Sequence, residues 1–178
     1  AEVKMMMDPN ANPFAAPADA SSVPEKFGAS DVQDLNWVQL LNAYTCTECG
    51  RCTSACPANI TGKKLSPRKI MMDTRDRLEE VGKNIDKNNG TFVPDNKQLL
   101  HDYITAEEIW ACTTCNACVE ECPVSISPLS IIMDMRRYLV MEQSAAPMPL
   151  NGMMSNVENN GAPWQYSQQD RLNWKNEN

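Results

Sequence analysis

The chain has 178 residues, enough for one compact domain with a tail at each end. Its formal net charge is −7 at pH 7, which argues against nucleic acid as a partner, because phosphate binding needs clustered Lys and Arg. The sequence has no run of about 18 apolar residues and no basic–hydrophobic leader, so we expect neither a membrane span nor a signal peptide.

Proline and cysteine positions divide the chain into three parts. Residues 1–29 contain prolines among Ala, Ser and Asn, which predicts a flexible linker or arm. Residues 30–143 contain all eight cysteines and the strongest helical patterns, so we expect one helical domain there. Residues 144–178 contain more prolines and then a polar stretch, which predicts a tail with a short helix capped by Ser167.

The first predicted helix covers about residues 31–45 and precedes the first group of cysteines. Four apolar residues recur on one of its faces at helical spacing: Leu35, Val38, Leu41 and Tyr44. A second helix runs from Pro67 to about Gly82, because Ser66 can cap it and the proline occupies its first position. Five residues form its expected buried face: Ile70, Met71, Thr74, Leu78 and Val81.

The second half of the chain repeats this order. Residues 95–104 predict a short helix, and another helix opens at Thr105 with a capping box closed by Glu108. The last helix of this half starts at Pro128 and should run to about Gln143. Its expected buried face has five members: Leu129, Ile132, Met133, Arg136 and Leu139. Few segments alternate apolar and polar residues, so the sequence predicts almost no strand.

Two cysteine runs share the spacing C-x2-C-x2-C-x3-C-P, and corresponding cysteines are 66 residues apart, which indicates an internal repeat. The first run contains Cys46, Cys49, Cys52 and Cys56, and the second contains Cys112, Cys115, Cys118 and Cys122. A disulfide framework would normally tie distant segments together, so reduced thiols are the better assumption for such tight groups. Three thiolates at this spacing can wrap one [4Fe–4S] cube, whereas the fourth lies too far along the chain to close it comfortably.

This spacing resembles the signature of two-cluster bacterial ferredoxins, in which the fourth cysteine of each run ligates the other cluster. The resemblance assigns the first cluster to Cys46, Cys49, Cys52 and Cys122. It assigns the second cluster to Cys112, Cys115, Cys118 and Cys56. Two all-cysteine zinc sites and a disulfide framework remain the alternatives, although zinc would more naturally show two C-x2-C pairs per site.

The segment of 55 residues between the two runs looks mostly helical, unlike the short chain of small bacterial ferredoxins. Over about residues 31–143 the sequence therefore resembles the α-helical ferredoxin group. It fits the heterodisulfide reductase C-like branch better than succinate dehydrogenase iron–sulfur subunits, because both runs are complete and no plant-type [2Fe–2S] domain precedes them. The resemblance implies an all-α fold with an internal pseudo-twofold repeat and two [4Fe–4S] clusters.

The same resemblance implies a function in electron transfer. We expect a domain without a catalytic substrate site that relays electrons between its clusters inside a larger, membrane-associated oxidoreductase of a respiratory chain. Its partners would be redox subunits such as a CCG-domain protein and a membrane anchor, and its location the cytoplasmic face of the cell membrane. The alternatives are an iron–sulfur subunit of a succinate/fumarate- or glycerol-3-phosphate-dehydrogenase-like complex and a catalytic iron–sulfur subunit.

Charged residues outside the runs suggest no further active site. We expect the recurring pairs Asp73/Asp134 and Arg75/Arg136 to form contacts on or between helices rather than acid–base sites. We expect the single histidine, His101, to be structural or exposed.

The charged residues inside the two runs differ. The first run contains Glu48 and Arg51 whereas the second contains Glu120 and Glu121, which predicts different reduction potentials for the two clusters.

Overall fold

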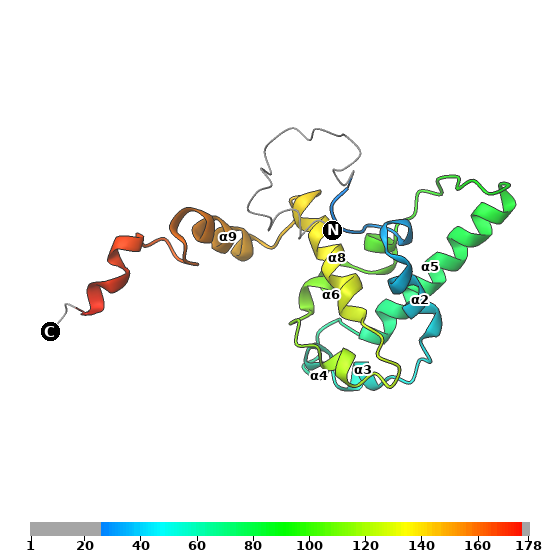
Figure 1. Cartoon of the computed structure of the whole chain (residues 1–178), viewed down its shortest axis with the longest axis horizontal. Helices are drawn as coiled ribbons and strands as arrows, with labels where there is room; N and C mark the ends of the chain where they lie inside the picture. Colours follow the sequence, from blue (N-terminus) through cyan, green and yellow to red (C-terminus); the bar gives the residue numbers. More distant parts are fainter. Residues whose placement is uncertain (1–25, 176–178) are drawn as a thin grey trace. The chain divides into compact units, whose positions relative to one another are not determined.

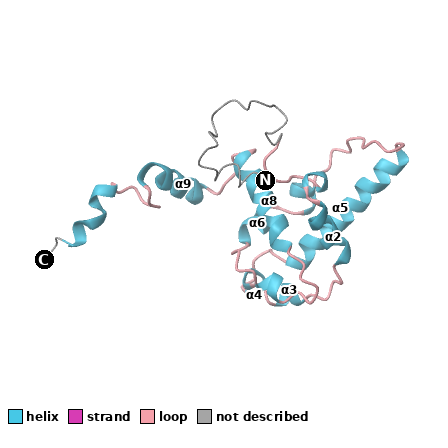
Figure 2. Cartoon of the chain, viewed as in Figure 1, coloured by secondary structure: helices cyan, strands magenta, loops and turns pink. Residues whose placement is uncertain are grey.

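The computed structural model describes residues 26–175, so most of the predicted arm over residues 1–29 lies outside the described part. The chain divides into two units, one ending at Glu142 and the other beginning at Gln143, and each is considered by itself. The described residues form helices and loops without any strand (Figure 2), which confirms the expected all-α fold. None of the described helices is long and apolar enough to cross a membrane.

The elements of the first unit appear in chain order in Figure 1. Its first half contains a short 3-10 helix η1 (Val32–Asp34) and the α-helices α2 (Trp37–Thr45), α3 (Arg51–Ser54), α4 (Pro57–Ile60) and α5 (Pro67–Lys87). Its second half contains the π-type turn η2 (Leu99–Tyr103) and the α-helices α6 (Ala106–Ala111), α7 (Ala117–Glu120) and α8 (Pro128–Met141). Helix α5 contacts both α2 and α8, and thereby joins the two halves.

Three of the predicted helix starts, those of α5, α6 and α8, are confirmed by their capping bonds. The Ser66 side chain accepts a hydrogen bond from the Lys69 N–H at the start of α5, and Ser127 accepts one at the start of α8. Thr105 and Glu108 form the expected capping box of α6, with both reciprocal bonds present. These side chains satisfy backbone N–H groups that have no partner within the helix.

The core lies between α5, α8 and the segments packed on them. Its fully buried side chains include Ile70, Met71, Leu99, Ile109, Ile131 and Met135. The predicted buried face of α5 is largely confirmed, although the helix also continues past Gly82 to Lys87. Arg77 was not expected on that face, yet its side chain is fully buried.

The burial of Arg77 is explained by two carboxylates. Its guanidinium forms ion pairs with Asp31 (2.7 Å) and Asp95 (2.5 Å) and donates a hydrogen bond to the Lys97 carbonyl oxygen (2.8 Å). A buried charge needs such partners, because desolvation otherwise makes it very costly. Arg77 thus connects α5 to the segment before η1 and to the loop before η2.

The predicted buried face of α2 is wrong in orientation, and that of α8 is only partly confirmed. On α2, Val38, Leu41 and Tyr44 are exposed, and the helix instead buries Gln39 and Ala43. The Gln39 side chain turns inward because it caps its own helix and donates a hydrogen bond to Asp134 on α8 (2.6 Å). The predicted single helix over residues 31–45 is also divided, since the Asn36 cap starts a new helix after η1.

The face of α8 is rotated from the predicted one. The helix buries Ile131, Ile132, Met135 and Leu139, whereas Met133 is exposed. The three successive apolar residues Ile131, Ile132 and Met133 cannot all face the core, and the sequence pattern alone does not show which of them do. Packing against α5 and α6 makes that choice.

The predicted helix over residues 95–104 is wrong. Residues 95–98 are extended or bent, and η2 contains two residues with non-helical backbone angles, Leu100 and His101. The turn buries Leu99 and Leu100, and its His101 is exposed with φ at 84°. Burial of two adjacent leucines therefore outweighs local helix propensity here.

The second unit contains α9 (Met148–Asn160) and the 3-10 helix η3 (Gln168–Lys175). The predicted short helix behind Ser167 corresponds to η3, and Ser167 accepts a hydrogen bond from the Gln169 N–H (3.2 Å). Helix α9 was not predicted, because its polar and methionine-rich sequence shows little helical periodicity. It begins directly after Pro147 and ends at Asn160, and the following Gly161 has the left-handed conformation common at helix C-termini.

Candidate functional site

The two cysteine loops have the same backbone conformation. In each loop, the second and fourth residues after the first cysteine are left-handed: Glu48 (φ 58°) and Gly50 (79°), then Thr114 (56°) and Asn116 (61°). Left-handed residues turn the chain tightly, which brings successive cysteines to one side of a loop. The sequence repeat is therefore also a repeat of local structure.

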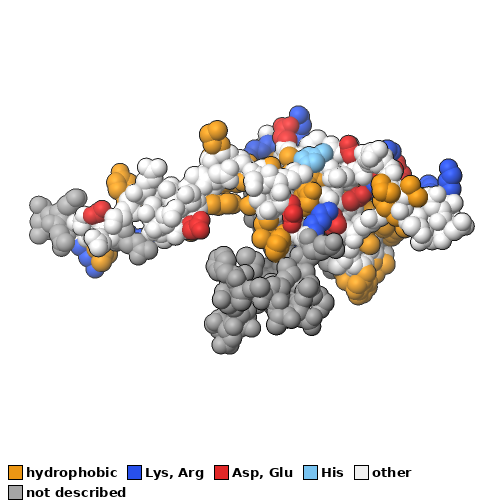
Figure 3. All heavy atoms as spheres, turned by 90° about the horizontal axis from the view of Figure 1, so that it is seen from above, with side chains coloured by type: hydrophobic (Ala, Val, Ile, Leu, Met, Phe, Trp, Pro, Cys, Tyr) orange, Lys and Arg blue, Asp and Glu red, His pale blue; other side chains and the backbone are white. Residues whose placement is uncertain are grey.

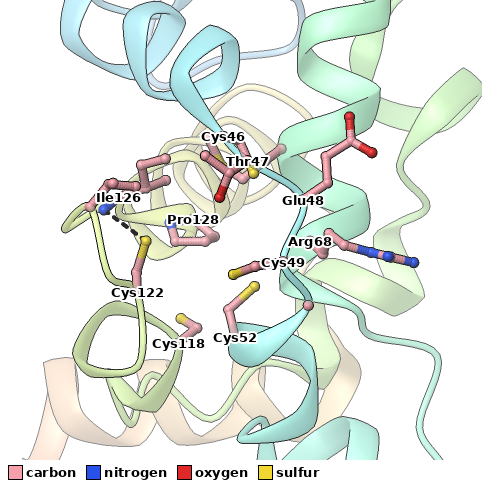
Figure 4. A pocket seen from close by; sticks show the side chains of 13 residues that line it. Cys46, Thr47, Glu48, Cys49, Cys52, Arg68, Cys118, Cys122, Ile126 and Pro128 are labelled. Atoms are coloured by element: carbon pink, nitrogen blue, oxygen red, sulfur yellow. Dashed lines mark hydrogen bonds between the residues drawn. The ribbon is translucent and has the colours of Figure 1, made fainter.

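Thiols from both runs line one cavity of the first unit. Cys46, Cys49 and Cys52 come from the first run, whereas Cys118 and Cys122 come from the second. Figure 4 shows the sulfurs of Cys49, Cys52, Cys118 and Cys122 turned toward a common space, whereas the side chain of Arg68 points away from it. The cavity thus brings together all four cysteines that the ferredoxin resemblance assigns to the first cluster.

Four apolar side chains also line this cavity, beside the polar or charged residues Thr47, Glu48 and Arg68: Met71, Val124, Ile126 and Pro128. None of them was singled out as a site residue, although the last three follow the second cysteine run directly. A dry, apolar surrounding strengthens electrostatic interactions and limits access of water to a bound group.

A second group of thiols surrounds Cys118. Burial, with smaller contributions from the neighbouring thiols of Cys112, Cys52 and Cys56, raises the pKa of the Cys118 thiol to about 11. Cys118 therefore lies near cysteines of both runs, and Cys56 is the one buried cysteine among the eight. The short helices α3 and α7, which follow the two loops, also lie against each other.

Cysteine exposure follows the repeat. Cys49 and Cys115, the second cysteines of their runs, are both exposed, whereas the other six are buried or half-buried. The Ala117 N–H beside its sulfur lowers the pKa of the Cys115 thiol. The exposed thiols mark two edges at which the cysteine loops meet solvent.

Backbone N–H groups also donate hydrogen bonds to the sulfurs of Cys112 and Cys122. The Thr114 N–H donates to Cys112 Sγ (3.4 Å), and the Ile126 N–H donates to Cys122 Sγ (3.3 Å). Such bonds stabilise thiolates and help to set the reduction potential of a bound iron–sulfur cluster. In the first half, the segment after Cys56 instead continues into α4, so the two fourth cysteines differ in their surroundings.

The donor set fits two [4Fe–4S] clusters. Eight thiols are the number that two such cubes need, because each cube would take four thiolates, one for each of its irons. Within residues 26–175, no three His, Cys, Asp or Glu side chains converge closely enough to hold a single metal ion. His101 lies outside the cavity lining.

The recurring arginines contact the cysteine loops in different ways. Arg75 on α5 forms an ion pair with Glu48 of the first loop (2.6 Å). Arg136 on α8 donates to the carbonyl oxygens of Ile109 and Cys112, at the start of the second loop. Arg136 thus makes the expected contact between helices, although its partners there are backbone oxygens and not a carboxylate.

The recurring aspartates form the expected pairs. Asp73 lies 2.6 Å from Lys69, four residues earlier on α5, and Asp134 lies 2.8 Å from Arg137 on α8. On the face visible in Figure 3, acidic and basic side chains are interspersed. The net charge of −7 is therefore not gathered into one acidic field on that face.

Residues 45–126 match the family of 4Fe-4S dicluster domains. The chain is 36% identical to the Bacillus subtilis protein named probable iron-sulfur-binding oxidoreductase FadF, over 86% of this chain and 26% of that protein. It is 33% identical to a probable membrane-anchored ferredoxin of Chromohalobacter salexigens, over 88% of this chain and 25% of the relative. It is also 33% identical to the C subunit of a CoB-CoM heterodisulfide reductase of Methanosarcina acetivorans, over 60% of this chain and 52% of that protein.

These similarities confirm the predicted resemblance to heterodisulfide reductase C-like proteins. The matched segment contains all eight cysteines, which fits two 4Fe–4S clusters. The chain spans about a quarter of the length of the first two relatives and about half of the third.

Proposed function

Because residues 45–126 belong to the family of 4Fe-4S dicluster domains, we propose that this chain is an electron-relay domain of a larger oxidoreductase. The observation that carries this proposal is the cavity shared by Cys46, Cys49, Cys52 and Cys122. Thiols from two distant runs meet there, as a cluster ligated by both halves would require. When bound, each cluster would accept and donate one electron.

We assign the ligands crosswise. The first cluster takes Cys46, Cys49, Cys52 and Cys122, and the second takes Cys112, Cys115, Cys118 and Cys56. The proximity of Cys118 to Cys56 supports the second set. Since Cys118 also lies near Cys52, the two sets are neighbours, which favours electron transfer between the clusters.

The larger assembly is also part of the proposal. One relative is named a membrane-anchored ferredoxin and another a subunit of a heterodisulfide reductase, which supports a role beside other redox subunits. We place this domain at the cytoplasmic face of a membrane, with a membrane anchor and a CCG-domain protein as its partners. The substrate chemistry would then belong to those partners, since the eight thiols are all used as cluster ligands.

Iron content and EPR spectra of the anaerobically purified full chain test the function. Two cubes require about eight irons per chain and a broad visible absorption. They should also give the EPR signals of two clusters that become paramagnetic on reduction. Colourless, iron-free protein or bound zinc would refute the proposal. Turnover of a substrate by the isolated chain would refute the assignment of a relay without catalysis.

Two double variants test the ligand assignment. Cys49→Ala with Cys122→Ala removes two ligands of the same proposed cluster and should leave the other intact, with about four irons per chain. Cys49→Ala with Cys56→Ala removes one ligand from each cluster and should damage both. If each run instead held its own cluster, the two variants would show the opposite pattern.

A further inference from the structure

The two cysteine loops differ in charge at the first of their two left-handed positions. Position 48 of the first loop corresponds to position 114 of the second, and both residues are left-handed, Glu48 at φ 58° and Thr114 at 56°. The first loop therefore carries a carboxylate where the second carries a hydroxyl. In the first half, that carboxylate pairs with Arg75 at 2.6 Å, so the charge of this arginine is locally compensated.

Arg136 is the counterpart of Arg75 but has no such carboxylate. Among residues 26–175, it forms no ion pair, and its N–H groups donate to the Ile109 carbonyl oxygen (3.1 and 2.8 Å) and to that of Cys112. These oxygens lie at the end of α6, where helix carbonyls lack partners within the helix. Arg136 thereby holds the backbone of Cys112, the first thiolate ligand of its run.

The surroundings of Arg136 limit its screening by water. The side chain is half-buried, and its guanidinium lies over the ring of Trp110, with 5.1 Å between Cζ and the ring centroid. The counterpart of Trp110 in the first half is Tyr44, which is exposed. A half-buried charge is screened less than an exposed one, such as that of Glu120 or Glu121.

From this asymmetry we propose that Arg136 positions the second cysteine loop and raises the reduction potential of the cluster ligated by Cys112. A positive charge near a cluster favours addition of an electron, whereas in the first half Glu48 cancels the equivalent effect of Arg75. The inference rests on the proposed function, because it requires two bound clusters. It does not depend on which cysteine is the fourth ligand, since Cys112 belongs to the second-run cluster in either arrangement.

EPR-monitored redox titration of the cluster-loaded full chain tests this inference. Arg136→Gln should shift one of the two midpoint potentials to a lower value, and Arg136→Lys should retain most of the wild-type value because the charge remains. Glu48→Gln should raise the other midpoint, since it leaves Arg75 uncompensated. The matched control is Glu48→Gln combined with Arg75→Gln, which removes an ion pair without a change in net charge and should leave both midpoints near wild type.

Thr114→Glu gives a second measurement if Arg136→Gln loses a cluster. It places a carboxylate at the position where Glu48 already fits the same backbone conformation, and should lower the midpoint of the second-run cluster. Two intact clusters with unchanged midpoints in Arg136→Gln would overturn the inference, as would shifts of the same midpoint by Arg136→Gln and Glu48→Gln. Should Thr114→Glu alone be measurable, an unchanged midpoint would overturn it too. A wild-type chain without two clusters would instead refute the proposed function.

Discussion

Replacement of Arg77 by methionine should strongly destabilise the first unit. The Arg77 side chain is fully buried, and its partners Asp31 and Asp95 are 14% and 25% exposed. Loss of one partner of a buried ion pair costs about 3–5 kcal/mol, and the partial exposure of both carboxylates places this variant near about 3 kcal/mol. For a chain of this length, that corresponds to a decrease in Tm of about 6–12 °C.

The assay is thermal unfolding of the cluster-loaded protein under anaerobic conditions, followed by circular dichroism at a fixed scan rate. Lys83→Met on the same helix is the matched control, because the Lys83 side chain is 79% exposed and should change stability by less than about 0.5 kcal/mol. Adding Asp31→Asn and Asp95→Asn to Arg77→Met should restore part of the lost stability, since no uncompensated carboxylate then remains. Equal Tm values for Arg77→Met and Lys83→Met would refute this reasoning.

Three further predictions concern the close approach at Gly28, the cap of α6 and the clusters. Gly28→Ala should destabilise the fold by about 2 kcal/mol or more, and a lowered Tm would show this. The reason is that Gly28 has φ at +75° and that an added Cβ would overlap backbone atoms of Asp134 and Tyr138. Thr105→Ala removes the capping box of α6 and should cost about 1 kcal/mol, whereas Thr105→Ser should be near wild type in the same melt. Removal of iron by a chelator under anaerobic conditions should lower Tm. It should also increase amide hydrogen exchange in both cysteine loops before exchange increases in α5. A uniform increase in exchange over the first unit would contradict a role of the clusters in joining the two halves.

The sequence was most informative where structure depends on neighbouring residues. Ser66, Ser127 and Thr105 cap helices through bonds to residues three positions ahead, so their roles could be predicted without knowledge of the fold. The buried faces of α2 and α8 could not be predicted as safely, because they depend on which helix packs against which. Gln39 shows the difficulty: it is polar, yet it is buried because its partner Asp134 comes from a helix 95 positions away in sequence.

The cysteines of the candidate site were predictable because each run places its ligand spacing within one short stretch of sequence. Arg77 was not, because its carboxylate partners lie 46 residues before it and 18 residues after it. The contrast between Arg75 and Arg136 was also hidden, although both residues were recognised as a recurring pair. This contrast arises because the second loop has Thr114 at the position that corresponds to Glu48 in the first loop. The difference at this position can be interpreted only once the structure shows that each arginine contacts its own cysteine loop.

The exposure of the cysteines suggests how such a relay would work. Under the proposed ligand assignment, each cluster has one exposed ligand, Cys49 or Cys115, whereas Cys52, Cys56 and Cys118 lie close to one another on the inner side. An electron would then enter at one exposed edge and leave at the other, and the step between the clusters would be short. The difference created by Arg136 would act on that inner step, because it changes the relative potential of neighbouring clusters without changing either exposed edge. Docking of partners and the direction of electron flow would therefore be set by different residues.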